Sequence, residues 1–160
     1  MKLVRLIVLG VLTTLFSVVA LAGSAADDIA VHNAYVRAVP PGTPNSAAFM
    51  NLMNNGSSDH AIVRAESGIS KVVELHTHKM EGGMMKMTPV EKIGVGANAK
   101  TILKPGGLHV MFLGLKQDVK AGDKVEFKLI FEDGSETTVT APVKKVMAGM
   151  KHDMKKTMKH

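Results

Sequence analysis

Residues 27–143 consist of short apolar segments separated by turn residues, and the clearest of these segments alternates apolar and polar side chains with a period of two, which restricts this part of the chain to folds built from strands. The clearest case runs from Val125 to Phe131, where every second residue is apolar. Alternation of this kind is typical of a strand with one buried face, because successive side chains point to opposite faces of a sheet. Since no stripe with the 3.6-residue period of a helix occurs before residue 144, we predict an all-β domain.

Turn signals divide the domain into short strands. Asp133-Gly134 separates the segment 125–131 from the β-branched run 137–140, an arrangement typical of a hairpin. Groups of Pro, Gly and Asn end other apolar segments, for example at Pro105-Gly106-Gly107. Seven to nine strands in this arrangement predict a two-sheet sandwich or Greek-key barrel. The remaining strands are expected at 29–37, 46–54, 61–65, 72–78, 84–90 and 108–115.

The N-terminal residues have the three parts of a secretory signal peptide. Lys2 and Arg5 are positively charged, residues 6–22 are apolar, and small residues allow cleavage after Ala22 or after Ala26. The apolar run is slightly long for a signal peptide, so an uncleaved membrane anchor is the alternative. We therefore expect segment 1–22 or 1–26 to be removed, leaving a soluble protein in the periplasm.

Cysteine content and charge exclude several classes of function. The chain has no cysteine, so it has neither disulfides nor thiolate metal sites, and no lipid can be attached at the signal site. Residues 27–143 carry a net charge of −1, whereas the tail 144–160 carries +5. Because the domain is nearly neutral and contains few aromatic residues, we do not expect it to bind nucleic acid.

Methionine and histidine indicate a copper site. Of the twelve methionines, four lie between residues 80 and 87 and four between residues 147 and 158, whereas methionines that fill gaps in a core are scattered. Thioether sulfur is a soft, neutral ligand that selects Cu(I), and imidazole binds copper in either oxidation state. Two such ligands of each kind leave a bound Cu(I) ion with a single positive charge, which is less costly to bury than two.

Spacing brings particular ligands together. His109 and Met111 are two residues apart on an expected strand, so they share a face, and Gly82-Gly83 is expected to turn the chain between two other ligand-bearing segments. Three adjacent strands would then gather four ligands at one exposed end of the sandwich. We assign the isolated residues His32, His60, Met50 and Met53 to structure and packing.

The complete pattern resembles the signature of the PCuAC-type periplasmic copper chaperones. It consists of His76, ten residues, Met87, twenty-one residues, His109, one residue and Met111. The resemblance implies a cupredoxin-like β-sandwich and a solvent-near Cu(I) site. It also implies partner proteins that give or receive copper in the periplasm, at the copper site of cytochrome c oxidase or among its assembly factors. Flanking similarity extends over residues 34–37, 40–45, 47–49, 73–76, 82–90, 103–107 and 111–116.

Further methionines and histidines suggest additional copper contacts. His78, Met80, Met84 and Met85 are candidates to replace a primary ligand in turn. The basic tail 144–160 is too polar to fold alone, and it is expected to be a second site for Cu(I) or Cu(II). Its alternatives are a basic helix on an anionic membrane surface and a solvated end. The candidate tail ligands are Met147, Met150, His152, Met154, Met158 and His160.

Several functions compete with copper delivery. A blue-copper electron carrier needs a Cys thiolate, which this chain lacks. We see no nucleophile–base motif and no paired carboxylates, so we do not expect an enzyme, and neither cleavage site leaves an N-terminal histidine of the kind that some copper oxygenases use. A β-sandwich adhesion module is a third alternative. The closest competitor is a copper buffer or resistance protein that sequesters the ion, since the same ligands serve both roles.

Overall fold

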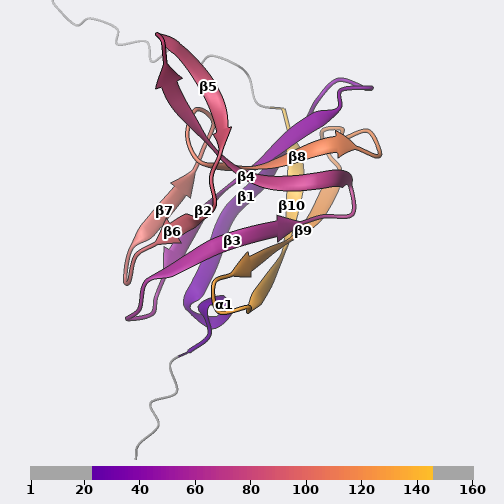
Figure 1. The fold of residues 1–160 in the computed structure, drawn as a ribbon. Helices are drawn as coiled ribbons and strands as arrows, with labels where there is room; N and C mark the ends of the chain where they lie inside the picture. Colours follow the sequence, from indigo (N-terminus) through magenta and orange to yellow (C-terminus); the bar gives the residue numbers. More distant parts are fainter. Residues whose placement is uncertain (1–22, 146–160) are drawn as a thin grey trace, which may run out of the picture.

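The computed structural model describes residues 23–145, which form ten strands and one short helix (Figure 1). The predicted signal peptide up to residue 22 and the tail from residue 146 onward lie outside the described residues. Within the described part, no helix has both the length and the apolar character needed to cross a membrane. The prediction of an all-β fold is confirmed.

The strands form two layers. The first layer contains β1 (Ile29–Arg37), β2 (Asn45–Asn54), β4 (Ser70–Glu81), β5 (Met84–Pro89), β7 (Lys100–Leu103) and β8 (His109–Leu115). The second contains β3 (His60–Glu66), β6 (Ile93–Val95), β9 (Lys124–Phe131) and β10 (Glu136–Lys144).

The two layers are hydrogen-bonded into one open path of strands. Its order is β5-β4-β8-β2-β1-β10-β9-β3-β6, and β7 pairs with β2 off this path. The layers join where β1 runs parallel to β10, with Val36 beside Val143. Because β8 lies between β4 and β2, strands distant in sequence become neighbours, which is the Greek-key arrangement that the sequence predicts.

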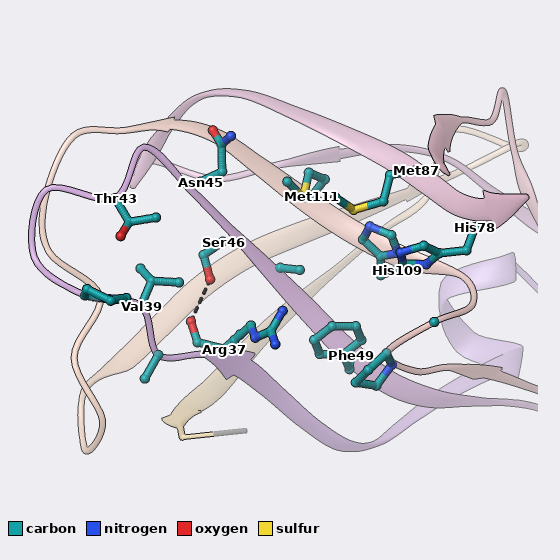
Figure 2. Close-up of a pocket in the computed structure, with 15 residues that line it drawn as sticks. Arg37, Val39, Thr43, Asn45, Ser46, Phe49, His78, Met87, His109 and Met111 are labelled. Atoms are coloured by element: carbon teal, nitrogen blue, oxygen red, sulfur yellow. Dashed lines mark hydrogen bonds between the residues drawn. The ribbon is translucent and has the colours of Figure 1, made fainter. Parts of the chain in front are cut away.

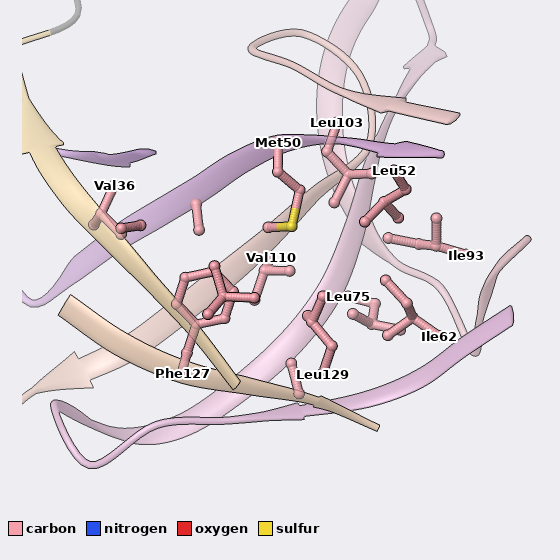
Figure 3. Close-up of a cluster of buried hydrophobic side chains, with 14 of the residues drawn as sticks. Val36, Met50, Leu52, Ile62, Leu75, Ile93, Leu103, Val110, Phe127 and Leu129 are labelled. Atoms are coloured by element: carbon pink, nitrogen blue, oxygen red, sulfur yellow. The ribbon is translucent and has the colours of Figure 1, made fainter. Parts of the chain in front are cut away.

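The hydrophobic core lies between the layers (Figure 3). Val110 and Phe112 of β8 point into it, and the Phe112 ring meets the Phe127 ring edge-on at a centroid distance of 5.7 Å. Met50 is 2% exposed, as expected for a packing residue, whereas Met53 is 37% exposed and is not a core residue, contrary to the prediction. Because these strands bury alternate residues, the opposite faces are free to carry other chemistry.

All eight strands predicted from the sequence are present, with ends that shift by a few residues. The sequence analysis missed α1 (Ala25–Asp28), β6 and β7. These elements span three or four residues each, too few for an apolar pattern to repeat. They form because longer neighbours supply their hydrogen-bond partners, as β2 does for β7.

His60 ties the N-terminal helix to the second layer, in keeping with the structural role expected for it. Its Nδ1 atom lies 2.8 Å from a Glu132 carboxylate oxygen and its Nε2 atom lies 3.1 Å from a carboxylate oxygen of Asp28. The hydrogen bond to Glu132 raises the pKa of His60 above its usual 6.5, desolvation by burial lowers it, and the bond to Asp28 raises it again, for a net increase.

Replacing His60 by glutamine is expected to cost more stability at acidic pH than at alkaline pH. A raised pKa in the folded state means that protonated His60 favours folding below about pH 6.5, and that this contribution is lost as the pH rises through the folded-state pKa. Chemical denaturation at about pH 5.5 and pH 8 measures the difference between wild type and His60→Gln. The exposed His32→Gln serves as control, with an expected change within about 0.5 kcal/mol. An equal cost of His60→Gln at both pH values would contradict the expectation.

Candidate metal centre

Strands β5, β4 and β8 are neighbours and carry the candidate ligands on their outer face, opposite the core. His109 and Met111 alternate with the core residues Val110 and Phe112, so they point outward. In the strand register, His76 lies directly opposite His109. Where β4 pairs with β5, His78 lies opposite Met87.

An open cleft of about 770 Å³ lies along this face (Figure 2). His78, Met87, His109 and Met111 line one part of it, and their side chains converge there in Figure 2. The cleft continues past these side chains to residues of β1, β2 and the loop between them, including Arg37, Val39 and Thr43.

Among the ligand candidates within residues 23–145, His109 is the most deeply buried, with 1% of its surface exposed. Its Nδ1 atom lies 2.9 Å from the carbonyl oxygen of Gly107, so Nδ1 carries the proton and donates it, because a carbonyl only accepts. Burial lowers the pKa of His109 below 6.5, and the neighbouring imidazoles of His76 and His78 lower it further. The ring is therefore neutral at pH 7, with the lone pair of Nε2 available to a metal ion.

His76 is held through its Nε2 atom, whereas His109 is held through Nδ1. Its Nε2 atom lies 2.7 Å from a carboxylate oxygen of Glu74, so Nε2–H donates to that oxygen. Its Nδ1 atom is buried and has no hydrogen-bond partner among the residues of the structure. An unpaired buried nitrogen costs about 1–3 kcal/mol, and a metal ion bound at this atom would remove that cost. A carboxylate that orients a ligating imidazole from the far side is a common feature of metal sites.

The thioethers range from half-buried to exposed. Met111 is half-buried opposite Glu74, and Met87 is 53% exposed. Met80, Met84 and Met85 lie on the outer half of the β4–β5 hairpin, which extends away from the body in Figure 1, and all three are exposed. The hairpin turns at Gly82-Gly83, as predicted, where φ values of 60° and 79° favour glycine.

This composition suits a soft monovalent ion. Between residues 23 and 145, no three or more His, Asp or Glu side chains are grouped so that they could hold a metal ion by themselves. Methionine sulfur lines the cleft beside the imidazoles, and this soft donor favours Cu(I) over Zn²⁺, Ca²⁺ or Mg²⁺. With neutral imidazoles and thioethers as ligands, the Glu74 carboxylate behind His76 supplies the one negative charge that balances Cu(I).

The candidate ligands of β8 lie on the outer face of the first layer, because they alternate along the strand with core residues. The structure differs from the sequence-based expectation in the places of two histidines. His78, expected to be auxiliary, lines the cleft directly, whereas His76 lies beside it. Glu74 and the Gly107 carbonyl were missed. Glu74 had a signal in its position two residues before His76, and the Gly107 carbonyl had none.

Comparison with known proteins gives three kinds of match. A family model described as "Putative lipoprotein LpqE-like" matches residues 29–143. Among curated proteins, "Putative lipoprotein Lxx21020" of Leifsonia xyli subsp. xyli is 35% identical over 123 residues, which cover 76% of this chain and 73% of that protein.

Solved structures give the third match. The solution structure of apo-DR1885 from Deinococcus radiodurans is 31% identical, covers 92% of this chain and 98% of its own, and has a TM-score of 0.60. The Cu(I) form of the same protein is 34% identical, covers 73% and 80%, and has a TM-score of 0.56. The copper-bound PCuAC domain from PmoF2 is 20% identical, covers 77% and 97%, and has a TM-score of 0.65, a likeness in fold alone.

Proposed function

The chain belongs to the LpqE-like family, which is of the PCuAC type, and from this premise we propose that it is a copper chaperone that binds one Cu(I) ion and passes it to another protein. The observation that carries the proposal is the arrangement of His76 and His109 beside two methionines. Nε2 of His76 donates to Glu74 and Nδ1 of His109 donates to the Gly107 carbonyl, so each ring keeps its other nitrogen for a metal ion. The relative from Deinococcus radiodurans, whose structure exists in a Cu(I) form, supports the choice of ion.

In the proposed site, His76 binds Cu(I) through Nδ1 and His109 binds it through Nε2. Met87 and Met111 supply the two sulfur ligands. Neutral ligands and a neighbouring carboxylate stabilise a monovalent ion without a thiolate, which suits an oxidising compartment where free thiols are lost to disulfides. The protein acts as a carrier and not as an enzyme.

We propose that the exposed methionines of the hairpin serve the exchange of copper. Met80, Met84 and Met85 lie next to Met87 along β4 and β5 and face solvent, so an acceptor protein reaches them first. His78, which lines the cleft, is placed to replace His76 or Met87 while a ligand from the acceptor enters. The acceptor is proposed to be a periplasmic copper protein of cytochrome c oxidase assembly.

Direct transfer of copper distinguishes a chaperone from a copper buffer. We expect the Cu(I)-loaded protein, checked by native mass spectrometry for one ion per chain, to lose copper at a rate that rises with the concentration of an apo copper-site acceptor. A buffer releases the ion spontaneously, so its rate would be independent of acceptor concentration and equal to that measured with a small Cu(I) chelator.

A variant of the β4–β5 hairpin tests whether its exposed methionines take part in copper transfer. Replacing Met80, Met84 and Met85 together by leucine keeps the exposed apolar surface but removes three sulfur atoms. We expect transfer to slow by roughly tenfold while Cu(I) affinity changes little, because kinetics of exchange depend on entering ligands. Unchanged transfer would assign the three methionines no part in exchange.

We also propose that the protein is exported and that cleavage follows Ala22. Cleavage after Ala26 would remove Ala25, which is fully buried and whose backbone N–H donates to Asp133 at 2.8 Å. It would also remove Ser24, which caps α1. Because the chain has no cysteine, it lacks the residue that would carry a lipid at the signal site.

The mass of the exported protein tests the proposed cleavage site. We expect intact-mass and N-terminal sequence analysis of periplasmic material to give a chain that begins at Gly23. Protein that begins at Asp27 would contradict the assignment, and retention of residues 1–22 in the membrane fraction would support the anchor instead. The substitution Ala22→Leu should reduce processing, while Ala26→Leu should not, since small residues are needed only at the cleaved site.

A further inference from the structure

One row of side chains on the outer face of the first layer connects the candidate copper ligands to two cations. Lys144 of β10 lies beside Arg37 of β1. The antiparallel register of β1 and β2 continues past Val36 and sets Arg37 beside Ala47, which in turn lies beside Met111 of β8. Arg37, Ala47 and Met111 all line the cleft. The row therefore crosses the cleft from a candidate copper ligand to Arg37 and Lys144, which we call the cation pair.

The cation pair has no carboxylate partner in the part of the chain that the structure describes. The ion pairs found between residues 23 and 145 include neither Arg37 nor Lys144. Like charges side by side on neighbouring strands destabilise a sheet. The Lys144 amino group is held at the cleft edge, 5.8 Å from the centre of the Tyr35 ring, in a cation–π contact. A bound anion would relieve the repulsion between these two charges.

The floor of the cleft between the cation pair and the copper ligands is apolar (Figure 2). Ala47 has only a methyl group in the middle of the row, which leaves the cleft open there. Beside it, the Phe49 ring lies between the rings of Tyr35 and His109, with centroid distances of 5.3 Å and 6.0 Å. The cleft thus has positive charge at one end, soft copper ligands at the other and an apolar floor between them.

We propose that this cleft receives an extended segment of the copper-exchanging partner protein, and that the segment carries a carboxylate and a soft copper ligand. The cation pair binds the carboxylate, since a guanidinium group donates two parallel hydrogen bonds to a carboxylate. The soft ligand of the partner then lies over Met111 and enters as the ligands of the sheet leave. The inference rests on the proposed function, and it adds the chemistry by which the partner is recognised.

The register sets the spacing between the two groups of the partner. Arg37 and Met111 lie two strand spacings apart, which is about 10 Å at about 4.8 Å per strand. An extended chain covers about 3.4 Å per residue, so the carboxylate and the soft ligand should stand about three residues apart. A partner in which the two groups are adjacent in sequence would not reach both ends of the cleft.

Titration of the copper-free full-length protein with the capped peptide Glu-Ala-Ala-Met tests the carboxylate site. Amide resonances of Arg37 and Ala47 report binding. We expect this peptide to bind about fivefold more tightly than Gln-Ala-Ala-Met at low salt, the upper range for an exposed ion pair, and we expect the preference to fall as salt is added. Equal binding of the two peptides would overturn the proposal. Shifts that depend on protein concentration without peptide would assign the cleft to a second copy and overturn it as well.

Substitution of the cation pair is the matched test. Arg37→Gln together with Lys144→Gln should remove the preference for Glu-Ala-Ala-Met. Lys124→Gln, which removes an exposed cation from β9 in the second layer, should retain it. A preference that survives loss of the cation pair would overturn the proposal.

The Cu(I)-loaded protein tests the soft ligand. We expect Glu-Ala-Ala-Met to bind the loaded protein more tightly than Glu-Ala-Ala-Leu, because thioether sulfur is a ligand for Cu(I) and a leucine side chain is not. Equal binding of these two peptides would overturn the proposal. Competition with a Cu(I) chelator should give the same copper affinity for wild type and for the variant without the cation pair. Absence of Cu(I) binding in wild type would instead refute the proposed function, so the two failures are distinguishable.

Discussion

Replacing Met111 by leucine is expected to weaken Cu(I) binding by more than about 100-fold, because loss of groups that only orient a metal ligand already costs 10–100-fold. Met111 is half-buried on β8, opposite Glu74, and its sulfur is one of two in the proposed site. Leucine keeps the apolar volume, so the fold should be retained at a cost below about 1.5 kcal/mol. Competition with a Cu(I) chelator measures the affinity.

Two comparisons make the Met111→Leu result specific. Met50→Leu removes a sulfur from the core on β2, where the side chain is 2% exposed, and is expected to leave the Cu(I) affinity unchanged. Binding of Cu(II) to Met111→Leu should fall less than binding of Cu(I), because thioether is the softer ligand. Equal losses for both ions, or no loss for Cu(I), would refute a site built on methionine sulfur.

Replacing Phe127 by alanine is expected to lower the free energy of unfolding by about 3–5 kcal/mol. The Phe127 ring is 1% exposed and packs edge-on against Phe112, so its removal opens a cavity between the two layers and also removes an aromatic pair. A typical domain is stable by only about 5–15 kcal/mol, so the variant would lose a large part of its stability. Urea denaturation monitored by circular dichroism measures the loss.

The Phe127→Ala variant also separates stability from copper binding. Phe127 lies on β9 in the second layer, while the candidate ligands lie on the outer face of the first. Under conditions where the variant is folded, its Cu(I) affinity should match that of wild type. The exposed Val72→Ala, at 49% exposure, is expected to change stability by about 0.5 kcal/mol or less. A comparable loss in both variants would contradict the described core.

Local patterns in the sequence predicted most of the strands and the type of fold. Alternation along β9 and the Asp133-Gly134 turn depend on contacts between residues near one another in the chain, so they are visible without a structure. The candidate ligands were also predicted, because thioether and imidazole chemistry is a property of residue types, and a resemblance in spacing related His76 and Met87 to His109 and Met111.

Only the tertiary structure determined how these residues meet. The register that sets His76 opposite His109 and places β8 between β4 and β2 depends on long-range pairing, which no local pattern encodes. The roles of Glu74 and the Gly107 carbonyl follow from distances of 2.7 Å and 2.9 Å to the two imidazoles, and these distances exist only after the strands have paired. The sequence therefore determined which chemistry is available, and the pairing of β4, β5 and β8 determined which face of the sheet displays it, because side-chain direction depends on register.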